Sequence, residues 1–291
     1  MIELSLLLFG ISIVAGALGS LLGLGGGFVI VPVLTLVFHL DIRLAIGTSI
    51  VAVAATSSAG AARNVTESIT NLRVATFLAL ATTVGALTGA LLVGVFDARL
   101  LFTLFGTVLA VSAAQMLRKR PLRAMQESTP AMETVGVTAG REGGAGRLAD
   151  RLALHSSYFD AAEGLHVPYV VANTGLGLGL MYLAGTLSGL LGIGSGVLKV
   201  PAMDLAMHIP MKVSTATSNL LIGLTAAASA VVYFARGDID PLIAGPVAIG
   251  ILLGATQGSR WLVRIRSDRL RVLFVSVLVV VAAQMILKGI G

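Results

Sequence analysis

Residues 16–49 read GALGSLLGLGGGFVIVPVLTLVFHLDIRLAIGTS, and residues 185–218 read GTLSGLLGIGSGVLKVPAMDLAMHIPMKVSTATS. Without a gap, the two stretches are identical at 13 of 34 positions, at a constant offset of 169 residues. The same offset pairs Gly85 with Gly254 and the AAQM at 113–116 with that at 282–285. Low-complexity apolar sequence rarely keeps one offset over such a length, so the chain is predicted to contain two homologous halves.

The composition is typical of a polytopic membrane protein. Only 12% of the 291 residues are charged and the mean hydropathy is +0.95, whereas soluble domains carry about 25% charged residues. Apolar stretches of roughly the 20 residues that span a bilayer as a helix recur through both halves. Because lipid admits only helices and closed barrels, and the stretches do not alternate as barrel strands do, the fold class is predicted to be all-α.

The charged residues divide the chain into three parts. Thirteen of the 34 charged residues fall between 118 and 166, a segment that also contains several glycines. We therefore expect an N-terminal membrane repeat over 1–120, a flexible cytoplasmic connector over 121–166 and a C-terminal membrane repeat over 167–291. A short helix is expected within the connector, near 149–162.

Loop charges predict that the two repeats are inverted. Four cations lie between Arg118 and Arg123, after the last helix of the first half, and five arginines lie between Arg260 and Arg271, before the last helix of the second. If both basic loops are cytoplasmic, each half crosses the membrane an odd number of times. Each half would then begin with a glycine-broken helical hairpin, followed by about three transmembrane helices.

The net charge of +6 does not indicate a nucleic-acid partner, because the basic residues lie at the ends of apolar segments. The chain has no cysteine, which excludes thiolate metal sites and cysteine nucleophiles. The glycine run at 23–27 does not match the dinucleotide-binding pattern and has no acidic residue about 20 positions later. No cofactor, metal or nucleic acid is expected.

The two glycine runs are the strongest candidates for a binding site. Each is followed five residues on by a proline, Pro32 or Pro201. Such a run can interrupt a helix, and the helix that follows it points orphan N–H groups and its positive dipole end at the break, which favours an anion. Interrupted segments at matching places in inverted halves indicate a transporter site, although close helix packing is the alternative. The candidate residues are Gly23, Gly25, Gly26, Gly27, Gly192, Gly194, Ser195 and Gly196.

Paired polar residues follow each run. Thr48 and Ser49 in the first half correspond to Thr217 and Ser218 in the second, and Asn219 extends the second pair. These groups can bind oxyanion oxygens, although Ser and Thr in membrane helices often bond only their own backbone.

Four further polar residues fall at matching positions. Arg43 and Lys212 are expected at helix starts, as snorkelling anchors or as attractors of anions. Gln115 and Gln284 are expected to bond across helices or to contact a substrate or gate.

Lys199 breaks the repeat symmetry, because its counterpart is Ile30. A cation in an apolar segment is costly and points to function, here as the counter-charge of an anion. The sequence also permits an intramembrane hydrolase with Ser195 as nucleophile and Lys199 as base, although the counterparts of both are apolar or glycine and no third orienting group is evident.

The pattern G-x-G-G-G-x-x-x-V-P at 23–32, followed by Thr48-Ser49 and repeated degenerately at 192–201, resembles the sulfite exporter TauE/SafE family. The resemblance covers nearly the whole chain and implies a secondary transporter of sulfite or an organosulfonate. The second half departs from the pattern at Ser195 and Lys199, which leaves the substrate open.

We therefore expect a multi-pass inner-membrane transporter that exports a small sulfur-containing anion by alternating access. A passive anion channel is the nearest alternative. Lipid and the anion are the expected partners, and a homodimer is left open.

Overall fold

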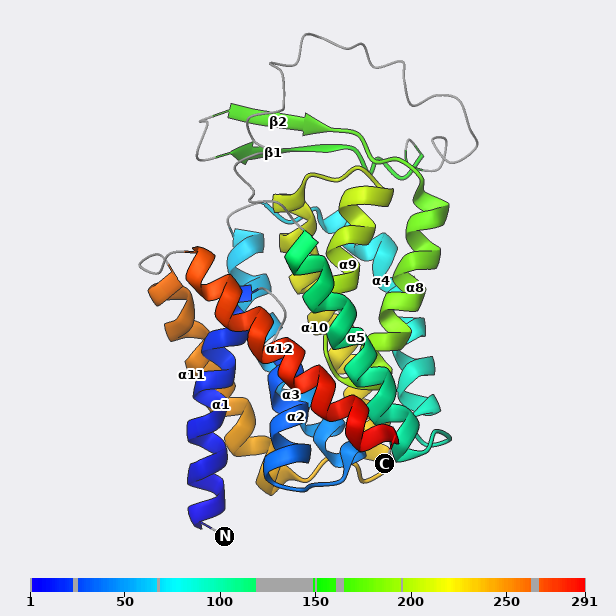
Figure 1. The fold of residues 1–291 in the computed structure, drawn as a ribbon. Coiled ribbons are helices and arrows are strands. Elements are labelled where there is room, and N and C mark those ends of the chain that lie inside the picture. The colour runs from blue at the N-terminus through cyan, green and yellow to red at the C-terminus, as the bar shows by residue number, and fades with distance from the viewer. Residues whose placement is uncertain are drawn as a thin grey trace.

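The computed structural model is mostly helical (Figure 1). It describes residues 2–22, 26–66, 69–118, 149, 151–160, 165–194, 196–262 and 267–290, apart from the side chains of 2–5, 18–22, 59, 62–64, 66, 115–118, 159–160, 166, 197, 258–262, 267–274 and 277. The elements are α1 (Ile2–Leu22), α2 (Gly27–Pro32), η1 (Val33–Val37), α3 (Ile42–Thr66), α4 (Leu72–Leu92), α5 (Ala98–Arg118), β1 (Ser156–Asp160), β2 (Leu165–Tyr169), α8 (Thr174–Leu191), α9 (Gly196–Pro201), η2 (Ala202–Ala206), α10 (Met211–Ala235), α11 (Pro241–Leu262) and α12 (Ser267–Ile290).

The sequence repeat reappears as a repeat of structure. The bounds of α2, η1 and α3 coincide with those of α9, η2 and α10 at the same offset of 169 residues. Pro32 and Pro201 explain one shared detail, because proline lacks the N–H that would continue an α-helix. After each proline the helix widens to a π-turn, as in the bond from the Phe38 amide to the Val33 carbonyl, 3.3 Å long.

Three of the described helices are long and apolar enough to cross a membrane: α4, α8 and α10. Shorter apolar stretches lie in α1, α3, α5, α11, α12 and the α2–η1 segment. The chain is thus a multi-pass membrane protein in composition and helix length, as predicted. In each half a long helix, α1 or α8, is followed by a short helix, α2 or α9.

Helices of one half pack against helices of the other. α3 and α10 run antiparallel, since Gly47 near the start of α3 approaches Asp238 after α10, and Ser57 approaches Gly223. α4 and α8 instead run parallel in close contact, because a Cβ on Gly85 would clash with the Tyr182 carbonyl. α1 and α11 repeat this parallel contact through Gly254, so Gly85 and Gly254 serve close helix packing.

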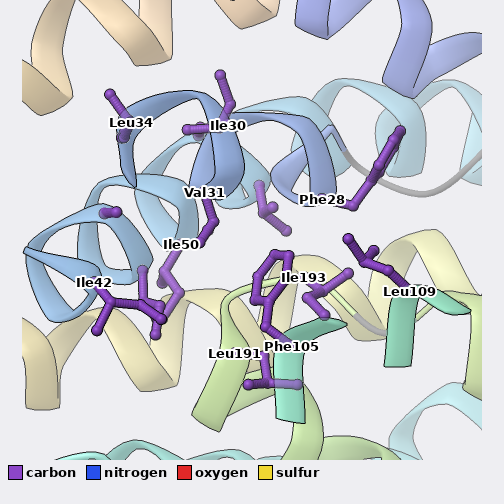
Figure 2. Close-up of a cluster of buried hydrophobic side chains, with 14 of the residues drawn as sticks. Phe28, Ile30, Val31, Leu34, Ile42, Ile50, Phe105, Leu109, Leu191 and Ile193 are labelled. Carbon is purple, nitrogen blue, oxygen red and sulfur yellow. The ribbon is translucent and has the colours of Figure 1, made fainter. Parts of the chain in front are cut away.

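The main hydrophobic core lies where both halves meet. Figure 2 shows Phe28, Ile30, Val31 and Leu34 from the α2–η1 segment gathered with Ile42 and Ile50 of α3, Phe105 and Leu109 of α5, and Leu191 and Ile193 at the end of α8. Most of these side chains are no more than 2% exposed. Both the first short helix and the second glycine break are therefore anchored in one core.

A two-stranded sheet corrects two expectations about the connector. The helix expected near 149–162 is present only at its start, where Ala149 and Arg151 are helical; β1 and β2 then pair antiparallel, so the chain is not purely helical. Aromatic residues favour strands, and Tyr158 of β1 lies diagonally across from Tyr169 of β2, with ring centroids 6.5 Å apart. Both tyrosines pack in a second core with Met203 and Leu221. Residues 119–148 lie outside the described residues.

Candidate functional site

The first glycine break turns sharply before α2. Gly26 has a φ of +72°, a left-handed backbone conformation that glycine adopts without strain. Its carbonyl then accepts hydrogen bonds from the amides of Val29 and Ile30, which begin the short helix. Gly23 and Gly25 of the predicted site lie outside the described residues.

The second break ends α8 in the same way. Gly192 has a φ of +66° and donates its amide to the Ser188 carbonyl, 2.9 Å away, as a left-handed helix cap does. Gly194 follows with a φ of +79°, and Gly196 begins α9. Ser195 lies outside the described residues, so its distance from Lys199, on which a hydrolase dyad depends, is not described.

The structure brings the two breaks into contact. A Cβ placed on Gly27 would lie 2.5 Å from the Gly192 carbonyl oxygen. The Ser49 hydroxyl lies between them, 2.8 Å from the Gly192 carbonyl oxygen and 3.3 Å from that of Gly27. Three of the predicted positions, Gly27, Ser49 and Gly192, are thus close together, although Gly192 is more than 140 residues from the other two.

Two other predicted hydroxyls are buried without a described partner. The side-chain oxygens of Thr48 and Ser218 accept or donate no hydrogen bond among the described residues, although the two residues are 0% and 1% exposed. A buried hydroxyl without a partner is costly, and most such groups in membrane helices bond a carbonyl of their own helix. Thr48 and Ser218 therefore have unused hydrogen-bonding capacity inside the protein.

Thr217 and Asn219 have different surroundings from these two. The Thr217 hydroxyl accepts the backbone amide of Asn71 at 3.3 Å, so it is engaged at the start of α4. Asn219 is half-buried, and a Cβ on Gly60 would lie 3.5 Å from its side-chain nitrogen. The repeat partners Thr48 and Thr217 thus differ, because only one of them has a described partner.

Lys199 is fully buried, with 0% exposure, and its ammonium donates to the Thr225 hydroxyl at 2.9 Å. Among the described residues it forms no other hydrogen bond and no salt bridge, and it is the one charged residue in the buried class. A buried cation without a carboxylate is normally unstable. It lies one helical turn after the second break, on α9.

The remaining predicted residues lie at the periphery. Arg43 is half-buried and donates to the Phe96 carbonyl at 3.0 Å, whereas Lys212 is exposed at the start of α10. The Gln284 side chain is exposed on α12, and the side chain of Gln115 lies outside the description. None of these described side chains contacts the meeting point of the breaks.

Sequence reasoning missed Thr225, whose hydroxyl accepts the Lys199 ammonium, and two further buried hydroxyls on the same helix. Thr225, Ser229 and Tyr233 follow one another at four-residue spacing on α10, and all three are no more than 1% exposed. The Ser229 hydroxyl donates to the Thr225 carbonyl at 2.9 Å, and the Tyr233 hydroxyl donates to the Gly189 carbonyl at 2.7 Å. Their helical spacing in an apolar segment was the available signal.

Comparison with known proteins places the chain among membrane transporters. A family model described as "Sulfite exporter TauE/SafE" matches residues 8–285. The chain is 26% identical over 289 residues to the "Probable membrane transporter protein YunE" of Bacillus subtilis, covering 96% of each chain. It is 25% identical over 296 residues to the "Probable membrane transporter protein MJ0441" of Methanocaldococcus jannaschii, covering 97% of this chain and 95% of the relative. No solved structure matches significantly.

Proposed function

The chain belongs to the sulfite exporter TauE/SafE family, and on that premise we propose that it is a secondary transporter of a small sulfur-containing anion, sulfite or an organosulfonate. We propose export across the inner membrane by alternating access. The family name and the names of the relatives point to transport and not to an enzyme. The observation that carries the anion assignment is the buried, carboxylate-free Lys199.

The proposed binding site extends from the meeting point of the two glycine breaks, at Ser49, along the α3–α10 contact to Lys199 and Asn219. Lys199 supplies the positive charge from α9, and Thr48 on α3 and Ser218 on α10 supply hydroxyls that lack a described partner. Ser49, which already contacts Gly192, and the half-buried Asn219 complete the set. Hydroxyl and amide donors bind oxyanion oxygens without a fixed charge, so the anion can still dissociate.

Inverted repeats would supply the two alternating states. The antiparallel packing of α3 on its counterpart α10 supports this arrangement, because two helices that cross a bilayer in opposite directions belong to oppositely oriented copies. α5 and α12 are also antiparallel, since Gly106 approaches Ala282 and Gly289 approaches Thr103. The end of α5 and the start of α12 then lie at the same end of the helix bundle (Figure 1). This is the arrangement expected if the basic loops next to these helix ends are both cytoplasmic.

Counterflow in proteoliposomes tests this function. Vesicles with purified protein are loaded with unlabelled sulfite or methanesulfonate and placed in a trace of the labelled anion. A carrier accumulates label transiently above equilibrium, whereas a channel only equilibrates it, so the assay also distinguishes the channel alternative. We expect accumulation with the unmodified protein and with Ile30→Met, and a loss with Lys199→Met. Vesicles that show no anion-dependent flux would contradict the proposal.

A further inference from the structure

We infer that the transporter carries anions of a single negative charge and rejects dianions, and that Thr225 is the residue that positions Lys199 for this selection. The inference rests on the proposed function, because it concerns the charge of the substrate at the same site. It names a narrower class: sulfonates and hydrogensulfite, as opposed to the sulfite dianion or sulfate.

Thr225 holds the Lys199 ammonium through a hydroxyl whose own hydrogen is already engaged. The Thr225 hydroxyl donates to the Leu221 carbonyl at 2.8 Å or the Ile222 carbonyl at 3.0 Å, one turn back along α10. A lone pair of the same oxygen therefore accepts from Lys199 at 2.9 Å. This contact uses one of the three ammonium hydrogens, so two remain for an anion.

The equivalent position in the first repeat has the same hydroxyl but no cation. Thr56 donates to the carbonyls of Ala52 and Val53, each at 3.1 Å, as Thr225 does on α10. The residue that corresponds to Lys199 there is Ile30, which is buried at 1% exposure. The site between the repeats therefore receives one positive charge from one side, and not two.

Other described cations are engaged away from the meeting point of the breaks. Arg43 donates to the Phe96 carbonyl, and Lys288 donates to the Thr35 carbonyl at 2.8 Å. Arg236 pairs with Asp238 at 3.0 Å and donates to the Ala90 carbonyl. The nearest described acid along the chain, Asp204 on η2, is half-buried and forms no ion pair with Lys199.

Charge balance then decides which anion fits. A monoanion beside Lys199 leaves the buried site neutral, whereas a dianion leaves one net negative charge away from water. An uncompensated buried charge is strongly unfavourable in a membrane protein. Shape alone cannot produce this preference, because methanesulfonate and sulfate are of similar size.

The test compares methanesulfonate with sulfate, which is a dianion at neutral pH. Affinity for purified protein and flux in proteoliposomes are measured for the unmodified chain, Thr225→Val, Thr225→Ser and Thr56→Val. We expect the unmodified chain to prefer methanesulfonate by at least about tenfold. Thr225→Val should weaken methanesulfonate binding by about tenfold and reduce the preference. Thr225→Ser should restore both, and Thr56→Val should change neither.

Equal affinity or flux for sulfate and methanesulfonate in the unmodified chain would overturn the inference. This comparison uses only the unmodified chain, so it does not depend on the folding of any variant. A Thr225→Val protein that folds and behaves like Thr56→Val would overturn the role of Thr225. An unmodified chain that carries neither anion nor sulfite would contradict the proposed function itself, so the two failures are distinguishable.

Discussion

The carbonyl oxygen of Gly192 lies 2.5 Å from the position that a Cβ on Gly27 would occupy. Two residues 165 positions apart thus lie too close together for a side chain at residue 27, and the Ser49 hydroxyl contacts the carbonyls of both. The contact requires glycine at residue 27 because any side chain there would displace the second break. Whatever the site binds, its geometry depends on this contact.

The first prediction concerns Gly27 itself. In Gly27→Ala, the new Cβ would meet the Gly192 carbonyl at 2.5 Å and the Ser49 hydroxyl at 2.7 Å. We expect a lower melting temperature and a loss of most anion flux, because neither backbone carbonyl nor the buried serine can move freely. The matched control is Gly179→Ala on α8, where nothing lies within 4 Å of the new Cβ. The control should be stabilised by up to about 1 kcal/mol, and equal behaviour of both variants would refute this reading.

The second prediction uses the absence of cysteine from the chain. A Cβ on Gly223 would lie 3.8 Å from the Cβ of Ser57, which is close to the mean separation in disulfides. The double variant Ser57→Cys/Gly223→Cys should therefore form an intramolecular disulfide on mild oxidation, measured by loss of maleimide labelling. The pair Ser57→Cys/Gly245→Cys should keep both thiols, since nothing lies within 4 Å of a Cβ at Gly245. Free thiols in the first pair would show that α3 and α10 are not packed antiparallel.

The third prediction concerns Asn71, which is buried at 8% exposure and joins three segments. Its side-chain oxygen accepts the Val74 amide at the start of α4, and its side-chain nitrogen donates to the Tyr169 hydroxyl at 2.7 Å and the Leu154 carbonyl at 3.0 Å. Asn71→Leu should cost about 2 to 3 kcal/mol in stability, as a lost cap and two lost hydrogen bonds. Asn71→Asp keeps the cap and should cost less, so an equal loss of melting temperature in both would contradict this assignment.

The ionisation of the Tyr169 phenol should report its hydrogen bond with Asn71. Burial raises the pKa of the Tyr169 phenol above its ordinary value, although hydrogen bonds with Asn71 and Ser156 partly oppose this. Loss of the Asn71 amide in Asn71→Leu removes one of the opposing contributions. The phenol of that variant should therefore ionise at a higher pH than in the unmodified chain, measured by ultraviolet absorbance. A lower ionisation pH in the variant would contradict the contact.

The fourth prediction concerns topology. The β-hairpin contacts the start of α4 through Asn71, whereas Asp97 follows the other end of this helix, about 31 Å away for a helix of 21 residues. If the connector is cytoplasmic, Asp97→Cys should react with a membrane-impermeant maleimide added to intact cells, and Ser157→Cys should not. Both positions are exposed, so burial does not protect either. The reverse labelling pattern would invert the orientation.

The repeated part of the chain could be predicted because the same sequence pattern occurs in both halves. The breaks at 23–27 and 192–196, the prolines and the bounds of the following helices all recur at one offset. The β-hairpin occurs once, in the connector, so no second copy indicates it. Its strands depend on long-range packing of Tyr158 and Tyr169 against helices of both halves, which local sequence does not encode.

The repeat also predicted part of the contact geometry at the two breaks. Ser49, Gly27 and Gly192 meet as the symmetry suggests. Lys199 could be recognised as unusual because its repeat partner is apolar. Its partner Thr225 could not be recognised, because the sequence has the same residue type, Thr56, at the equivalent position of the first repeat. Whether the hydroxyl of Thr56 or that of Thr225 accepts a lysine depends on tertiary contacts.

Calorimetric titration of methanesulfonate into purified protein tests the central claim most directly, namely that the buried Lys199, on the helix that follows the second glycine break, binds an anion. The unmodified chain and Ile30→Met should show saturable binding at one site. Lys199→Met, kept only if its melting temperature matches that of the unmodified chain, should show none. Undiminished affinity in a folded Lys199→Met protein would contradict the account.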